Sequence, residues 1–116
     1  MKRTVLAIVL LTAAVIVAFF LKKEDIAVLI YKEDTVYAGK YNENNFRSIK
    51  IGSSQTCVRE LLGDPLRTVD LTSPPRTCWI YADGNTNSSI HNFRIRNIEF
   101  DEKKSAVKKE VGLYVD

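Results

Sequence analysis

The chain opens with a long apolar segment, and a mixed pattern of apolar and polar residues follows it. From residue 5 to residue 21 only Thr12 is polar, and Lys and Arg side chains flank the segment at both ends. A helix of this length, at about 1.5 Å per residue, approaches the thickness of a hydrocarbon core. The segment has no polar face of the kind that a surface helix carries. The pattern predicts a membrane anchor or signal segment over residues 1–23.

The residues that close this segment favour an anchor over a cleaved signal. A cleavage site needs small residues, whereas Phe19, Phe20 and Leu21 end the apolar stretch. A short basic N-terminus usually stays in the cytoplasm, which sends the following chain outward. These flanks predict a single-pass membrane protein whose C-terminal domain lies in the periplasm or at the cell exterior. The alternative is a secreted or periplasmic protein after signal cleavage.

A connector at residues 24–44 has weak local signals, and a well-marked helix follows it. Ser54 supplies a capping hydroxyl at the start, and Gly63 and Pro65 end the helix. Three apolar residues recur at helical spacing and so share one face: Val58, Leu61 and Leu62. Upstream, a polar stretch is expected to cap a short helical turn that brings Phe46 to a core. Short helices are marginal alone, so we expect these to pack on a sheet.

The pattern after this helix changes to the alternation that is typical of strands. Strands are expected at residues 78–82, 90–100 and 106–116, with a bulge near Asn97 where the alternation shifts phase. The last strand offers four candidate core residues: Val107, Val111, Leu113 and Val115. The order of elements predicts an α+β fold. It consists of an N-terminal transmembrane helix and a small domain with one or two short helices packed on a three-stranded antiparallel sheet.

Seven positions within residues 49–65 carry a family resemblance: Ile49, Gly52, Ser54, Val58, Leu62, Gly63 and Pro65. Together with the Trp/Tyr strand, the hairpin IEFDEKKSAV and the closing LYVD, they make residues 45–116 similar to the SmpA/OmlA (BamE-like) domain of small envelope proteins. The resemblance implies an αα-βββ domain that serves as an accessory or scaffold and is not an enzyme. Two departures from the family pattern are Ser53, where a Met is usual, and the lack of a lipoprotein cysteine after the apolar segment.

Composition and the few reactive side chains exclude several classes of function. The 17 Lys and Arg residues are interleaved with 14 Asp and Glu residues, which does not suit a nucleic-acid surface. His91 is the only histidine, and no nucleophile or metal-ligand spacing surrounds it, so we expect no catalytic site, metal or cofactor. In an oxidising compartment Cys57 and Cys78 are disulfide candidates, and two buried free thiols are the alternative.

Aromatic and basic side chains are the candidates for binding a partner. Arg94 and Arg96 share one strand face, and Trp79 and Tyr81 share another. Each pair also has an ordinary structural interpretation, as a solvated strand face or as core packing. The polar loop at residues 83–89 is a further candidate. The sequence thus predicts a membrane-anchored, non-enzymatic envelope accessory protein that binds an envelope protein partner and resembles outer-membrane protein assembly factors. The alternative is a ligand-binding or enzyme-inhibitory module for a lipid, glycan or protein target.

Overall fold

The computed structural model describes residues 23–116, which divide into two units. Helix α2 (Lys23–Ile30) belongs to the first unit, and the second is an α+β domain over Lys32–Asp116. Among residues 23–116, no helix is both long enough and apolar enough to cross a membrane. The anchor predicted at residues 1–23 falls almost entirely outside the described residues.

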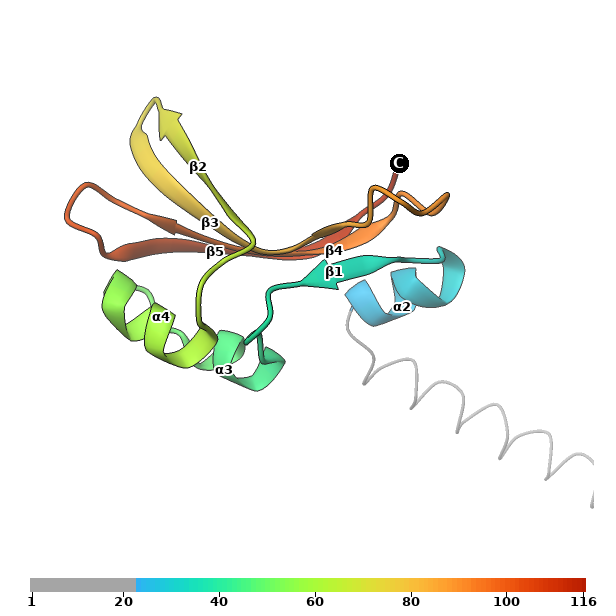
Figure 1. Cartoon of the computed structure of the whole chain (residues 1–116), viewed down its shortest axis with the longest axis horizontal. Helices are drawn as coiled ribbons and strands as arrows, with labels where there is room; N and C mark the ends of the chain where they lie inside the picture. The colour runs from blue at the N-terminus through green and yellow to red at the C-terminus, as the bar shows by residue number, and fades with distance from the viewer. Residues whose placement is uncertain (1–22) are drawn as a thin grey trace, which may run out of the picture. The chain divides into compact units, whose positions relative to one another are not determined.

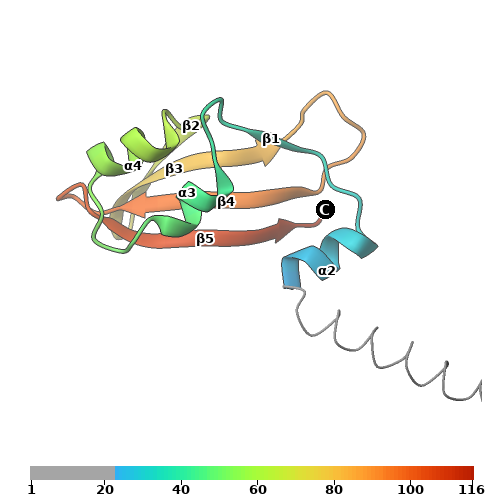
Figure 2. The same cartoon turned by 90° about the horizontal axis from the view of Figure 1, so that it is seen from below.

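The domain is built on a five-stranded antiparallel sheet with two helices on one face (Figures 1 and 2). The strands are β1 (Thr35–Tyr37), β2 (Arg67–Thr72), β3 (Pro75–Gly84), β4 (Phe93–Phe100) and β5 (Ala106–Tyr114). The helices are α3 (Glu43–Ser48) and α4 (Gln55–Leu62). β2 pairs with the first part of β3 and β1 with its last part, and β4 and β5 follow on the other side.

Local capping signals place both helices. The Asn42 side chain accepts a hydrogen bond from the Asn45 N–H, and the Ser54 side chain accepts one from the Cys57 N–H. Gly63 ends α4 with a φ of 72°, a conformation that favours glycine. A Cβ at this position would also lie 2.7 Å from the Cβ of Lys40. The predicted cap and stop of the second helix are therefore confirmed, and the short first helix forms as expected.

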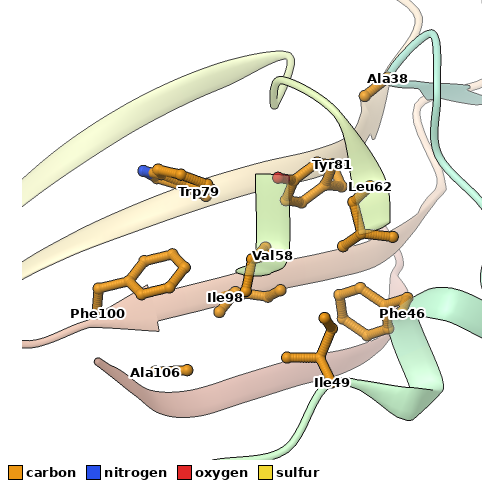
Figure 3. Packing of buried hydrophobic residues seen from close by; sticks show 10 residues of the cluster. All are labelled: Ala38, Phe46, Ile49, Val58, Leu62, Trp79, Tyr81, Ile98, Phe100 and Ala106. Carbon is orange, nitrogen blue, oxygen red and sulfur yellow. The ribbon is translucent and has the colours of Figure 1, made fainter. Parts of the chain in front are cut away.

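The hydrophobic core lies between the helices and one face of the sheet (Figure 3). Its buried members are Ala38, Phe46, Ile49, Val58, Leu62, Trp79, Tyr81, Ile98, Phe100 and Ala106. Burying one large apolar side chain of this kind stabilises a fold by roughly 1.5–3 kcal/mol. This packing therefore holds together two helices that would be marginal alone.

The predicted three-stranded sheet was wrong, because the domain has five strands. No strand was predicted over the residues of β2, because most of them are polar, and its pairing with β3 is what makes the segment a strand. β1 lies in the expected connector and pairs with the far end of β3. The irregular position predicted near Asn97 lies instead in β3, between Ile80 and Ala82, while β4 keeps its alternation. In β5, Val111 and Val115 are exposed and do not belong to the core.

Candidate binding surface

The sheet has a second face on which neither α3 nor α4 lies (Figures 1 and 2). Side chains alternate along each strand, so the residues between the core positions point to this side. We call this surface the outer sheet face. Its members are Arg67, Val69 and Leu71 from β2, Cys78 and Ile80 from β3, Phe93, Ile95, Asn97 and Glu99 from β4, and Lys108, Glu110, Gly112 and Tyr114 from β5.

The floor of the outer sheet face is largely apolar although no helix packs on it. Ile80 is buried, and Phe93 and Ile95 are half-buried beside it. The Phe93 ring stacks on the ring of Tyr114, with centroids 5.0 Å apart. At the two ends of the face, Leu71 and Tyr114 expose 41% and 47% of their surface. An apolar strip of this kind is costly to leave in water and marks a surface that a partner can cover.

The outer sheet face is hollowed because the β2–β3 hairpin bends away from the helices (Figure 1). A groove of about 600 Å³ separates the hairpin from β4 and β5 and is lined by Leu71, Thr72, Ser73, Pro74, Arg76, Glu99, Val107 and Lys108. A smaller hollow of about 160 Å³ lies over Ile80, Ile95 and Asn97. The face therefore offers a curved floor into which side chains of another molecule can fit.

Charged residues of both signs surround this floor. The Arg67 Nε lies 2.8 Å from an Asp83 carboxylate oxygen. The Lys108 Nζ lies 3.1 Å from Glu110 and 3.6 Å from Glu99. All these pairs are at least partly exposed, so each adds little stability. Their alternating signs suit a polar rim that fixes the orientation of a partner and contributes little to its affinity.

One buried polar atom on this floor has no hydrogen-bond partner. The Asn97 Nδ2 donates to a Glu110 carboxylate oxygen at 3.5 Å, but the Asn97 Oδ1 is buried and accepts no hydrogen bond from the described residues. Leaving a buried acceptor unpaired costs about 1–3 kcal/mol. A donor that a bound molecule placed over Asn97 would remove this cost.

The predicted arginine pair lies on the helix-covered face, and both guanidinium groups have carboxylate partners within the domain. The Arg96 side chain is 1% exposed, and its Nε lies 3.1 Å from both carboxylate oxygens of Glu43. The Arg94 Nε lies 3.4 Å from a Glu33 carboxylate oxygen. Burial tends to raise the pKa of Glu43, but hydrogen bonds from Arg96 and Tyr41 outweigh it and lower that pKa. Arg94 and Arg96 therefore take part in ion pairs within the domain and do not form an exposed basic patch.

The predicted aromatic pair is also buried, so it does not form a partner-binding surface. Trp79 packs against Phe100, with ring centroids 4.7 Å apart, and the Arg59 guanidinium lies 4.8 Å from its ring. The Tyr81 hydroxyl donates to the Gly63 carbonyl oxygen at 2.9 Å. Both rings point from β3 into the core (Figure 3).

The predicted disulfide does not form, and both cysteines are free thiols. Cys57 is exposed on α4, which covers the core face, whereas Cys78 is buried on the outer sheet face. The sheet lies between the two side chains, so a bond would require them to cross it. Burial, with the nearby Glu99 and Glu110 carboxylates, raises the pKa of Cys78 to about 11. This thiol is therefore protonated at neutral pH.

Residue types that suit catalysis do not gather in the part of the chain that the structure describes. Residues 23–116 contain no group of His, Cys, Asp and Glu side chains that could hold a metal ion. His91 is exposed and lines a hollow of about 290 Å³ with Asp83, Tyr114 and Asp116. The polar loop after β3 contributes to this hollow at the end of the outer sheet face.

Sequence reasoning missed the members of the outer sheet face because it lacked the strand register. The sequence pattern alone did not show which side of β4 the helices would cover, so Ile95 and Asn97 were not recognised as members. Leu71 was missed because its strand was not recognised.

Comparisons of the chain with protein-family models, with curated proteins and with solved structures find no match.

Proposed function

We propose that this chain is a non-enzymatic interaction module of the bacterial envelope. The apolar segment at residues 5–21 would hold it at the inner membrane, and the domain would lie in the periplasm. There it would bind an envelope protein through the outer sheet face.

The observation that carries this proposal is the uncovered sheet itself. In the domain over Lys32–Asp116, one face has two helices and a complete core, while the other has an apolar floor with no helix on it. Antiparallel sheets often pack one face against the core and leave the other in solvent, and the solvent face is then usually polar. Here Ile80, Phe93 and Ile95 make that face apolar. An apolar floor inside a charged rim is the usual anatomy of a protein interface.

The chemistry of the face describes the partner segment that fits it. The floor calls for one or two apolar or aromatic side chains, and the unpaired Asn97 Oδ1 calls for an N–H or O–H donor beside them. Arg67 and Lys108 on the rim would face acidic groups, and Asp83 would face a basic one. A protein segment can supply this combination of groups, and its mixed charges would fix the orientation.

Two features of the sequence support the same proposal. Residues 49–65 resemble the SmpA/OmlA pattern, whose domains serve as accessories or scaffolds, and α3 and α4 precede β2, β3, β4 and β5, although β1 comes before both helices. The apolar residues 5–21 have the length and flanking charges of an anchor. We therefore favour a scaffold role for the chain over a catalytic one.

Site-specific photocross-linking in native membranes tests the proposal. A photoreactive residue at Leu71 or Lys108 on the outer sheet face is expected to form a discrete adduct with one other protein. The same residue at Glu60, exposed on α4, serves as the matched control. The adduct should disappear when Ile95 is changed to Asp, provided that the variant remains folded. Equal labelling from Glu60, or an adduct that the Ile95→Asp change leaves intact, would reject the outer sheet face as the binding surface.

The groove beside the β2–β3 hairpin favours a second candidate function, the binding of a small ligand. Its volume of about 600 Å³ lies within the range of small-molecule sites. Arg76 and Lys108 in its lining suit an anionic group above an apolar wall. An apolar fluorescent probe that bound the folded chain, and that Lys108→Glu displaced, would favour this function. Failure to bind would leave the protein-interaction proposal alone.

A further inference from the structure

The open edge of β5 is a second surface with no partner strand in the domain, and it borders the outer sheet face. β5 is the last strand of the sheet order, so one of its sides has no neighbouring strand. The first residues of that side are occupied, because the Gly52 N–H donates to the Ala106 carbonyl at 2.7 Å. Further along, the Lys109 Nζ donates to the carbonyls of Phe46 and Ile49 at the end of α3. From residue 111 onward, no segment of residues 32–116 pairs with the edge.

The backbone groups that point out of this edge follow from the pairing with β4. The Arg94 N–H donates to the Thr35 hydroxyl, so it points away from β5. Arg94 lies opposite Leu113 in the pairing of β4 with β5. Because the Arg94 N–H points away from β5, Arg94 and Leu113 form no hydrogen bonds with each other. The N–H and carbonyl of Leu113 therefore point away from β4, out of the open edge. By alternation, those of Val111 point outward too. Two residues therefore present unpaired donors and acceptors along one short edge.

The side chains along this part of the edge lack the usual protection against pairing. Natural edge strands are protected by charges, prolines or bulges. Lys108, Lys109 and Glu110 protect the first half of β5, but residues 111–115 carry no charge. Val111, near the middle of the open edge, is 58% exposed. This half of the strand is suited to pair with another strand.

One residue of this strand, Gly112, is a glycine although neither packing nor backbone conformation within the domain requires one. A Cβ added at Gly112 would meet no atom within 4 Å, and its φ is not positive. A glycine inside a strand costs stability and commonly marks a close approach of another backbone. Gly112 therefore fits a position where a second strand approaches.

We infer that two copies of the chain pair through their β5 edges, antiparallel and in register about Gly112. In this register Val111 of each copy lies opposite Leu113 of the second copy, and the two pairs form about four interchain backbone hydrogen bonds. Lys108 lies opposite Asp116 of the second copy, on the same face of the sheet. Two-fold symmetry repeats each contact, as expected for a closed dimer. The two five-stranded sheets join into one continuous sheet.

The charges select a second copy in this register over neighbouring ones. A shift that centres the pair on Leu113 would oppose Glu110 and Asp116, which repel. A shift that centres it on Val111 would oppose Lys108 to Tyr114 and Glu110 to Gly112, so no opposite charges would meet. A shift that centres it on Glu110 would oppose that carboxylate to its own copy. Centring on Gly112 avoids the repulsions, pairs Lys108 with Asp116 and places Glu110 beside the Tyr114 hydroxyl of the second copy. The Gly112-centred register is therefore the one in which the charges of the strand complement each other.

Disulfide trapping of the full-length chain tests this register. In a Cys57→Ser background, Gly112→Cys places two thiols opposite each other in a pair without hydrogen bonds, where the strands are closest. Mild oxidation is expected to give a dimer at least about tenfold faster than Lys108→Cys, which would not lie opposite itself. A mixture of Glu110→Cys and Tyr114→Cys chains should give the mixed dimer and little of either homodimer. Equal rates at Gly112 and Lys108 would overturn the pairing.

A proline variant tests the pairing without relying on an added thiol. The Val111 N–H points outward, so Val111→Pro removes a donor from the edge and none from the pairing with β4. This change in the Gly112→Cys background is expected to abolish trapping, whereas Val111→Thr should preserve it. The native mass of the otherwise unchanged chain should also fall from dimer to monomer with Val111→Pro. If the proline variant stays folded and dimeric, the β5 edge is not the interface.

Discussion

Replacing Glu43 by Gln removes a carboxylate that binds a buried guanidinium. The Arg96 side chain is 1% exposed and lies 3.1 Å from both carboxylate oxygens, whereas Glu43 itself is 35% exposed. Breaking a fully buried ion pair costs about 3–5 kcal/mol. Because water reaches Glu43 and Gln keeps one acceptor oxygen, we expect a loss of about 2 kcal/mol in the free energy of unfolding. For a domain of this size that lowers Tm by about 8–16 °C.

Urea unfolding of the full-length chain measures this loss, with fluorescence of the buried Trp79 as the signal. Glu102→Gln, on the exposed turn after β4, is the matched control and should change stability by less than about 0.5 kcal/mol. The pKa of Glu43 is lowered in the folded state, so its contribution is complete above its unfolded value of about 4.3. The contribution is lost as pH falls below that value towards the folded pKa. If Glu43→Gln behaves like Glu102→Gln at pH 7, the ion pair does not stabilise the fold as argued.

Three further predictions concern the end of α4, the core and the cysteines. Gly63→Ala should cost about 1–3 kcal/mol because its φ is positive and its Cβ would clash, whereas Gly39→Ala, with open space, should be nearly neutral in the same urea titration. Tyr81→Phe should cost about 1 kcal/mol, the worth of its buried hydrogen bond, and no loss would contradict that bond's role. Intact mass after alkylation at pH 8 should show Cys57 modified in the folded chain and Cys78 only after unfolding, and a mass that fits a disulfide would contradict the structure.

The parts of the fold that could be predicted are those that depend on neighbours in sequence. Ser54 and Gly63 define α4 through contacts within one or two turns. The apolar spacing identifies Val58 and Leu62 as its buried residues, whereas Leu61, predicted on the same face, is exposed. Phe46 reached the core as expected. These signals are local, so no knowledge of the sheet was needed to interpret them.

The parts that were missed depend on pairing between distant strands. The sequence of β2 is polar and mostly exposed, and it is a strand only because β3 lies beside it. The face that each strand residue occupies depends on which side the helices cover, so Arg96 was predicted to be exposed and is buried against Glu43. The alternation along β4 was predicted to shift near Asn97 and in fact continues, and the choice of its inner face could not come from β4 alone. For the same reason the outer sheet face was not recognised as a candidate site.

The central claim is that a protein partner covers the outer sheet face in the envelope, and the accessibility of one thiol tests it most directly. In a Cys57→Ser background, the alkylation rate of Ile95→Cys would be measured in native membranes and in the purified chain, with Glu60→Cys as the control on α4. The account predicts that Ile95→Cys reacts several-fold more slowly in membranes, while Glu60→Cys reacts equally in both. Equal rates for Ile95→Cys in the two settings would mean that nothing covers this face, and the proposed function would be wrong.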